Sequence, residues 1–366
     1  MRVEILSIAT AVPEHRLDAA AALEELRRFW PRLERLTETE ASLGARYLCE
    51  PVDRLLRPRG LDELRTSYQE HALRLAAQAG GRALAGAGLS GRDVDLVITV
   101  SCTGYLVPSL DVHLAPVFGL RPDVVRLPIT LLGCSGGAAA LGFGARHLRA
   151  FPDHTVLVIA VELPSLNFKP ADGSSDNLTA SLVFGDGAGA AVLGGPRGSG
   201  SGLRVIRTES YLAAGTADLL GFNLGDAGFS VVLDRRLPRV LERELAPVVD
   251  RFLSSGDEPA PAFFVAHAAG PRIFDAVETA LELPDDALTV SREVFMEFGN
   301  TSSAAIFFVL EKLVSSLGST PRGGLGLGFG PGVSVELMQL AWTPSEDARD
   351  EASAVGEMAA VGARGV

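Results

Sequence analysis

Two apolar segments in distant parts of the chain share one layout. Val94–Gly104 (VDLVITVSCTG) and Pro261–Gly270 (PAFFVAHAAG) are rich in β-branched or aromatic residues, and each ends in a reactive side chain followed by glycine. Such runs are typical of buried strands. Along the chain, short apolar runs of this kind alternate with longer amphipathic stretches, which predicts an α/β fold with helices covering the sheets. The likeness of the two segments favours a duplicated unit.

A segment rich in glycine and serine divides the chain. Gly194–Gly202 (GGPRGSGSG) is the clearest linker signal. We therefore expect one half over residues 1–194, a second over residues 203–344, and a flexible tail with no catalytic role over residues 345–366. The periodicity predicts strands over Val94–Ser101, Thr155–Val161, Ala188–Leu193, Leu203–Thr208, Ala262–Ala266, Leu325–Phe329 and Val333–Trp342, and helices over Leu61–Ala87, Arg239–Leu253, Pro271–Leu283 and Thr301–Leu317.

The composition is typical of a globular protein with a large core, since the 366 residues are 47% hydrophobic and 21% charged. A formal net charge of −12 argues against nucleic acid and anionic membranes as partners. Three cysteines, Cys49, Cys102 and Cys134, are too few and too scattered for a disulfide framework or a zinc site, which favours a cytoplasmic location. The N-terminus lacks the pattern of a signal peptide, and no apolar run reaches the roughly 18 residues that a membrane span needs.

Cys134 is the first candidate for chemistry. It lies in the glycine turn Leu131–Gly137 (LLGCSGG), and an apolar run that starts with small residues follows it. This pattern places a thiol at the N-terminus of a helix, where unpaired N–H groups and the helix dipole favour the thiolate. A small buried core residue is the alternative interpretation.

His267 and Asn300 are two further candidates, each beside a glycine at the end of an element. His267 follows an apolar strand and precedes Gly270-Pro271, so its imidazole is expected at the carboxyl edge of a sheet. Asn300 precedes Thr-Ser-Ser-Ala-Ala. A buried core histidine and a helix N-cap are the structural alternatives for these residues taken singly.

Together, a cysteine, a histidine and an asparagine suit acyl transfer and carbon–carbon bond formation. A thiolate attacks a thioester and holds the acyl group. Imidazole and amide donors stabilise the enolate that forms when malonyl-CoA loses CO₂. This chemistry needs neither a metal nor a redox cofactor.

Five motifs make the chain resemble a known family, the type III polyketide synthases of the thiolase superfamily, whose type members are chalcone synthases. The resemblance extends to about Trp342, and the motifs occur in the order and spacing of that family. They are GC-x-GG at Gly133–Gly137, FGDGA at Phe184–Ala188, AH-x-x-GP-x-I at Ala266–Ile273, GN-x-SSA at Gly299–Ala304 and GFGPG at Gly328–Gly332. The resemblance implies a homodimeric thiolase fold with duplicated αβαβα halves.

The resemblance also implies roles for individual residues. Cys134 would be the nucleophile, and His267 and Asn300 would promote decarboxylation. Phe184 and Phe229 would be gatekeepers between a CoA tunnel and the acyl cavity, and Val107 would reach the cavity of the partner subunit. Further cavity residues implied in this way are Ser302, Cys102, Thr103, Pro164 and Asn167, and the implied CoA contacts are Arg32, Arg35, Arg46, Gly270 and Pro271.

The product class is the least determined feature. Leu219–Phe229 and Ser334–Trp342 are most similar to bacterial alkylpyrone and alkylresorcinol synthases, which implies a fatty acyl-CoA starter extended with malonyl-CoA. Cys102 resembles a cysteine of tetrahydroxynaphthalene synthases, which are primed with malonyl-CoA. Two other classes stay open, namely a ketoacyl synthase III-like enzyme that uses acyl carrier protein and a non-catalytic scaffold.

Overall fold

The computed structural model describes residues 3–30, 44–195, 202–225, 228–256 and 258–344. The expected linker and the expected tail therefore lie largely or wholly outside the described residues. Within the described part, no helix is long and apolar enough to cross a membrane, and no group of three or more His, Cys, Asp or Glu side chains could hold a metal ion.

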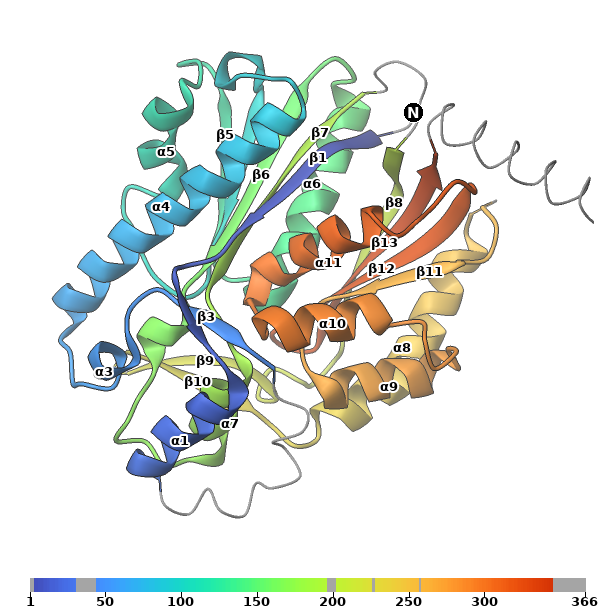
Figure 1. The fold of residues 1–366 in the computed structure, drawn as a ribbon. Helices are drawn as coiled ribbons and strands as arrows, with labels where there is room; N and C mark the ends of the chain where they lie inside the picture. The colour runs from blue at the N-terminus through green and yellow to red at the C-terminus, as the bar shows by residue number, and fades with distance from the viewer. Residues whose placement is uncertain (1–2, 31–43, 196–201, 226–227, 257, 345–366) are drawn as a thin grey trace, which may run out of the picture.

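One nine-stranded sheet runs through the molecule in the order β11-β12-β13-β8-β1-β7-β6-β4-β5 (Figure 1). Its strands are apolar and largely buried, as in β6, whose eight residues are all buried. The bounds are β1 Val3–Ala11, β4 Leu96–Val100, β5 Val125–Ile129, β6 Thr155–Glu162, β7 Gly187–Gly194, β8 Gly202–Leu212, β11 Phe263–Ala266, β12 Arg322–Gly330 and β13 Ser334–Thr343.

The sheet consists of two repeats of one strand order. In the first, β4 and β6 are parallel, and β6, β7 and β1 follow as antiparallel neighbours. In the second, β11 and β12 are parallel, and β12, β13 and β8 follow in the same way. The first strands of the repeats, β1 and β8, pair with each other and join the two. The expected duplicated α/β unit is therefore present.

Helices cover both faces of the sheet, and two lie in the middle. Helices α4 (Leu61–Gly86) and α5 (Leu110–Phe118) cover the outer face of the first repeat, while α8 (Leu237–Ser254), α9 (Pro271–Leu281) and α10 (Thr289–Phe298) lie outside the second (Figure 1). Helices α6 (Gly136–Ala150) and α11 (Ala305–Val314) are buried against strands of both repeats. Each repeat thus brings the N-terminal end of one central helix to a shared centre.

Shorter elements gather at one end of the molecule, at the lower left of Figure 1. They include the hairpin β9–β10 and two helices that pack through Leu23, Leu26 and Leu182. Their bounds are β2 His15–Leu17, α1 Ala19–Phe29, β3 Arg46–Leu48, α3 Val52–Leu55, η4 Pro164–Asn167, α7 Ser175–Val183, β9 Leu220–Gly225 and β10 Gly228–Leu233, with single turns η2 Gly91–Asp93, η3 Gly133–Ser135 and η5 Ser302–Ala304 elsewhere.

Most predicted elements are confirmed within a few residues. The predicted helix over Thr301–Leu317 is wrong at both ends, because its first turn is the separate 3₁₀ turn η5 and α11 ends at Val314. The predicted strand over Leu203–Thr208 is the longer β8. The periodicity did not predict the edge strand β5, the hairpin β9–β10 or the helices α1, α3, α5, α7 and α10.

Candidate active site

Cys134 lies in η3, directly before α6, as the glycine turn predicts. Gly133 has a φ of +55°, and a Cβ there would lie 2.5 Å from the ring of Pro331, so the GFGPG loop requires a glycine next to the cysteine. A Cβ on Gly137 would lie 2.0 Å from the carbonyl oxygen of Ser303. Glycine at these two positions therefore allows the start of α6 to lie against η5 and the Cys134 turn to lie against Pro331.

Cys134 is a half-buried residue. Burial raises the pKa of the thiol to about 12, a contact with Ser302 opposes the rise, and the carboxylate of Glu162 adds to it. The expected lowering of this pKa by the helix N-terminus is therefore not found, because desolvation outweighs it. At neutral pH the sulfur is therefore a thiol in this structure.

His267 and Asn300 contact each other directly. Nε2 of His267 lies 3.0 Å from Oδ1 of Asn300, and the amide of Asn300 donates to the carbonyl of Ala269 at 3.3 Å. An amide oxygen only accepts, so Nε2 carries the proton and the buried Nδ1 has no partner among the described residues. Burial lowers the pKa of His267 to about 4, so the imidazole is neutral.

Ser302 connects this pair to the cysteine. Its hydroxyl lies 3.3 Å from Sγ of Cys134, and its backbone N–H donates to Oδ1 of Asn300 at 2.8 Å. Ser302 has a φ of +52°, an uncommon conformation for a residue with a side chain. The contacts thus join Cys134, Asn300 and His267, from distant parts of the chain, through one residue.

Glu162, at the end of β6, forms hydrogen bonds with residues around the site. It was not identified from the sequence. It is fully buried and accepts hydrogen bonds from the backbone of Cys102 at 3.1 Å, the hydroxyl of Thr103 at 2.6 Å and the hydroxyl of Ser303. Burial raises the pKa of its carboxyl. The signal that could have identified it is an acidic residue at the end of a buried strand that is apolar apart from its first residue, Thr155.

An apolar cavity opens next to Ser302. It lies among the short elements at the end of the molecule, and most of its wall is aliphatic or aromatic. Of the residues implied to line the acyl cavity, the wall contains Phe184, Phe229, Ser302, Thr103, Pro164 and Asn167.

Two implied cavity residues do not line this wall. Cys102 instead packs behind it, with Sγ 3.5 Å from the hydroxyl of Ser302. Burial and the neighbouring Glu162 raise the pKa of the Cys102 thiol well above its usual range. Val107 is 96% exposed on the loop before α5, which agrees with a contact outside its own subunit but does not test one.

The implied CoA contacts have different outcomes. Arg32 and Arg35 lie outside the described residues. Arg46 is 1% exposed and lines the cavity. The expectation that it belongs to an exposed basic patch at a tunnel mouth is therefore wrong. Gly270, with a φ of +136°, and Pro271 form the turn into α9 and do not line the cavity.

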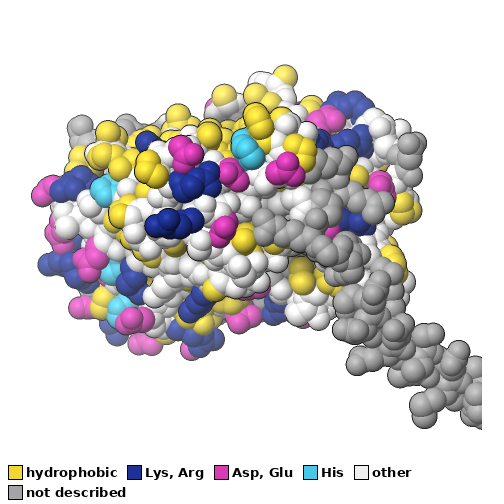
Figure 2. Space-filling view, turned by 90° about the horizontal axis from the view of Figure 1, so that it is seen from above, with side chains coloured by type: hydrophobic (Ala, Val, Ile, Leu, Met, Phe, Trp, Pro, Cys, Tyr) yellow, Lys and Arg dark blue, Asp and Glu magenta, His cyan; other side chains and the backbone are white. Residues whose placement is uncertain are grey.

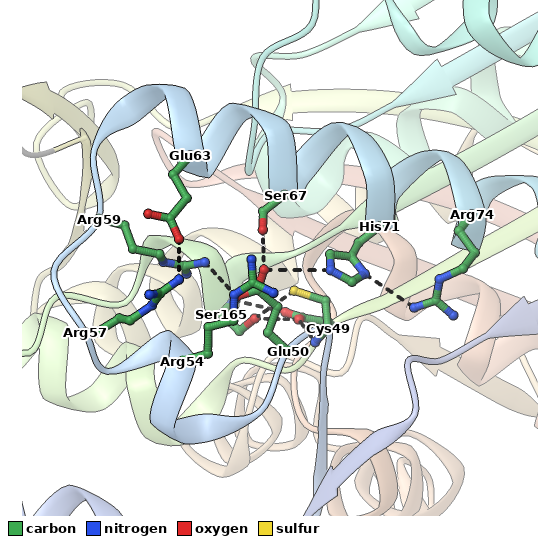
Figure 3. Close-up of polar contacts among 11 residues, drawn as sticks. Cys49, Glu50, Arg54, Arg57, Arg59, Glu63, Ser67, His71, Arg74 and Ser165 are labelled. Carbon is green, nitrogen blue, oxygen red and sulfur yellow. Dashed lines mark hydrogen bonds and ion pairs between the residues drawn. The ribbon is translucent and has the colours of Figure 1, made fainter.

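A buried ion pair holds one wall of the cavity in place. Glu50 follows β3 and accepts a hydrogen bond from Arg59 at 2.7 Å, and both side chains are almost fully buried. Figure 3 shows Glu50 facing Ser67 and His71 of α4, while the adjacent Cys49 faces Ser165. Because α3 follows Glu50 and its residue Leu55 lines the cavity, this cluster fixes α3 against α4.

The surface also carries apolar side chains. Figure 2 shows them gathered along the upper edge of that view, while charged groups occupy the face toward the viewer. The most exposed large apolar residues of the described part include Val107 at 96%, Leu131 at 76% and Leu212 at 69%.

Comparisons with known proteins agree with the motifs and the fold. Residues 58–196 match the N-terminal domain, and residues 205–343 the C-terminal domain, of chalcone and stilbene synthases. A 1,3,6,8-tetrahydroxynaphthalene synthase of Streptomyces peucetius subsp. caesius is 36% identical, over 92% of this chain and 93% of that protein. A phloroglucinol synthase of Pseudomonas fluorescens is 31% identical, over 90% and 97%.

Solved structures are similar over nearly the whole chain. The tetrahydroxynaphthalene synthase of Streptomyces coelicolor A3(2), a type III polyketide synthase, superposes with a TM-score of 0.88 at 32% identity, covering 93% of this chain and 100% of that one. The germicidin synthase of the same organism gives 0.86 at 26% identity, covering 93% and 100%. The chain has the thiolase fold of these enzymes and belongs to the chalcone and stilbene synthase family, the type III polyketide synthases.

Proposed function

We propose that this enzyme condenses an apolar acyl-CoA starter with several molecules of malonyl-CoA on Cys134 and cyclises the chain to an alkylpyrone or an alkylresorcinol. The observation that carries the proposal is the apolar cavity whose wall includes Ser302, the residue that contacts Cys134. Members of this family need no cofactor beyond the CoA thioesters that they consume.

The first step is starter loading. The sulfur of Cys134 attacks the thioester carbon, a new C–S bond forms, and the bond to CoA breaks. The thiol proton ends on the departing CoA sulfur, with His267 as the expected carrier. Because the raised pKa of Cys134 and the lowered pKa of His267 favour a neutral thiol and a neutral imidazole, we expect deprotonation to accompany attack rather than to precede it.

The second step is decarboxylative condensation. Malonyl-CoA loses CO₂, and the electrons of the broken C–C bond form an enolate. We assign its stabilisation to the amide N–H of Asn300 that Ala269 does not occupy, and to Nε2–H of His267 once it turns from Oδ1 of Asn300 to the thioester oxygen. The enolate carbon attacks the Cys134 thioester, a C–C bond forms, and the sulfur leaves. Transfer of the lengthened chain back to Cys134 starts the next cycle.

The cavity wall favours an apolar starter. Leu26 from α1, Leu55 and Leu56 from around α3, and Phe168 after η4 all face it. Burying each methylene of a fatty acyl chain against such a wall contributes about 0.8 kcal/mol. A starter without an alkyl chain leaves this wall uncovered.

A second candidate is priming by malonyl-CoA to give a tetrahydroxynaphthalene-type product. Two observations favour it, the contact between Cys102 and Ser302 beside the nucleophile and the relatives named for that activity.

We also propose that two copies pair through the loop that carries the exposed Val107, since burying an apolar side chain that is 96% exposed would stabilise the pair.

The experiment is to incubate purified protein with malonyl-CoA and acyl-CoA starters of increasing length and to read product masses. We expect pyrone or resorcinol masses with fatty starters, and none from Cys134→Ala. The control is Gly81→Ala on α4, whose added Cβ meets nothing within 4 Å and which does not line the cavity; it should retain product formation. A product from malonyl-CoA alone would favour the second candidate, and activity only with acyl carrier protein would refute both.

A further inference from the structure

Three aliphatic side chains of the cavity wall come from one short segment. Val52 and Leu55 belong to α3, Leu56 follows it directly, and all three line the cavity. Helix α3 has four residues, and no side chain caps its N-terminus. A single helical turn is unstable by itself, because its few hydrogen bonds do not offset the entropy lost on ordering it. Contacts outside α3 must therefore set the position of these three side chains, which we call the α3 wall.

A buried ion pair joins the two ends of this segment. Glu50 precedes α3 and Arg59 follows it. Oε2 of Glu50 accepts a hydrogen bond from Nη1 of Arg59 at 2.7 Å, and the two side chains are 2% and 3% exposed. Nε of Arg54, within α3 itself, lies 3.4 Å from the same oxygen. We call this ion pair the Glu50–Arg59 clamp, because it closes the chain into a loop that contains α3.

The clamp is held by parts of the molecule that belong to the core. Ser67 and His71 of α4 face the Glu50 carboxylate (Figure 3). Oε1 accepts a hydrogen bond from the hydroxyl of Ser67 and lies 3.8 Å from Nε2 of His71. In the preceding residue, the backbone N–H of Cys49 donates to the buried carboxylate of Asp186 at 2.7 Å. Glu50 is therefore fixed both through its side chain and through its neighbour in the chain.

The clamp and the apolar packing of α3 act differently. Val52 and Leu55 also pack in a core cluster that includes residues of α4, but apolar packing has no preferred direction and allows small shifts. A charge-assisted hydrogen bond between buried groups favours one length and direction, and loss of one partner leaves a buried charge behind. Neither Glu50 nor Arg59 lines the cavity. The pair therefore acts on a substrate through the position of α3.

We propose that the Glu50–Arg59 clamp fixes the α3 wall and so determines how strongly the enzyme discriminates between starters of different chain length. This inference rests on the proposed function and extends it. Against a fixed apolar wall, each added methylene that makes contact favours a starter about fourfold. A wall that can retreat loses part of this contact, so the preference per methylene becomes weaker. Glu50 and Arg59 are positioning residues, and neither touches the reacting atoms.

The test measures kcat/KM for a series of acyl-CoA starters from acetyl-CoA to decanoyl-CoA, with malonyl-CoA as the extender. Glu50→Gln combined with Arg59→Met removes both charges, keeps an acceptor for Ser67 and leaves neither buried charge without its partner. We expect the gain per methylene along the rising part of the series to fall from about fourfold to about twofold or less. The value for acetyl-CoA should stay within about twofold of the wild type, because this starter has no methylene that reaches the wall. Arg59→Lys, which keeps the charge, should restore most of the gain.

The matched control is a second ion pair, outside the cavity. Nη2 of Arg292 on α10 lies 2.6 Å from Oε2 of Glu278 on α9, and neither residue lines the cavity. Glu278→Gln combined with Arg292→Met should leave the gain per methylene at the wild-type value. Thermal melting of each protein confirms that the kinetic measurements are made on folded samples.

Hydrogen exchange of the wild-type protein tests the clamp without any variant. The backbone N–H groups of Leu55 and Leu56 close the single turn of α3, at 3.1 and 2.9 Å from their acceptors. We expect both groups to exchange roughly 100-fold or more slowly than in an unfolded peptide, because a fixed turn seldom opens. Exchange at the rate of an unfolded peptide overturns the proposal.

Two kinetic results also overturn it. One is an unchanged gain per methylene in the folded double variant, and the other is an equal loss with every starter, since the ion pair would then serve stability alone. A wild-type protein that makes no polyketide from any starter refutes the proposed function itself. That result differs from product formation with an unchanged gain, so the two failures are distinguishable.

Discussion

Replacement of Asp186 by asparagine should change how stability depends on pH. Asp186 is fully buried in the FGDGA segment. Its Oδ2 accepts from the backbone N–H of Cys49 at 2.7 Å and from the hydroxyl of Ser165 at 2.5 Å, and Oδ1 accepts from the backbone N–H of Ser165 at 3.0 Å. Burial outweighs these bonds and raises the pKa of the carboxyl from 3.8 to about 6. The folded protein therefore holds the proton more tightly than the unfolded chain.

The sign and size follow from this difference. Between pH 3.8 and about 6 the folded state is protonated while the unfolded state is ionised, so unfolding releases a proton and stability falls as the pH rises. The pKa difference corresponds to about 3 kcal/mol in the free energy of unfolding. This stabilising contribution is fully present below pH 3.8 and is lost above about pH 6. Asp186→Asn removes this dependence. The substitution also lowers the free energy of unfolding by about 1–3 kcal/mol at every pH, because the NH₂ group of asparagine would face the N–H and O–H donors that Asp186 accepts from.

Urea denaturation of both proteins between pH 4.5 and pH 7.5 measures the effect. The wild-type stability minus that of Asp186→Asn should fall by about 2 kcal/mol or more between these limits and level off above pH 7. The sequence pI is about 5.1, so low protein concentration is needed to limit association near zero net charge. A difference that stays constant with pH would show that the pKa of Asp186 is not raised and would refute the reasoning.

Three other changes have defined outcomes. Gly137→Ala should destabilise the protein by about 3 kcal/mol or more and abolish acylation of Cys134, because the new Cβ would meet the Ser303 carbonyl at 2.0 Å. Thermal melting and intact-protein mass measure the two effects. The control is Gly81→Ala, whose Cβ meets nothing within 4 Å. Ala22→Trp, in the cavity wall on α1, should lower kcat/KM for long starters by about fourfold per excluded methylene while sparing short ones, and a uniform loss would contradict the cavity assignment. Val107→Glu should weaken dimerisation at least tenfold in sedimentation experiments, and an unchanged dimer would remove Val107 from the interface.

The sequence predicted the fold best where strands are buried on both faces. Val94–Ser101 and Thr155–Val161 are continuous apolar runs, and the structure contains them as β4 and β6. The hairpin β9–β10 was not predicted, because a short two-stranded sheet lacks the sustained apolar pattern of the main sheet. The class and the duplication are confirmed, while the limits of the two halves and the roles of the site residues stay predictions.

In the site, local pattern predicted position but not environment. The glycine turn correctly placed Cys134 before a helix, yet the pKa of its thiol depends on burial and on Glu162, which comes from another strand. Arg46 was expected at an exposed tunnel mouth, because one sequence does not show that β3 runs beneath the cavity. Long-range packing decides such properties, and a single chain gives no direct sign of it.

The backbone on both sides of Phe184 is fixed by hydrogen bonds to Asn300. Val183 accepts from the N–H of Asn300 at 2.8 Å, and Gly185 donates to the carbonyl of Asn300 at 3.1 Å, so the main chain on both sides of Phe184 is tied to the residue that we assign to enolate stabilisation. A swinging lid at this point would pull the amide out of place. If Phe184 is the gate that the resemblance implies, admission of an acyl group must therefore occur by rotation of the phenyl ring about its own bonds, on the rapid timescale of side-chain motion and without displacing Asn300.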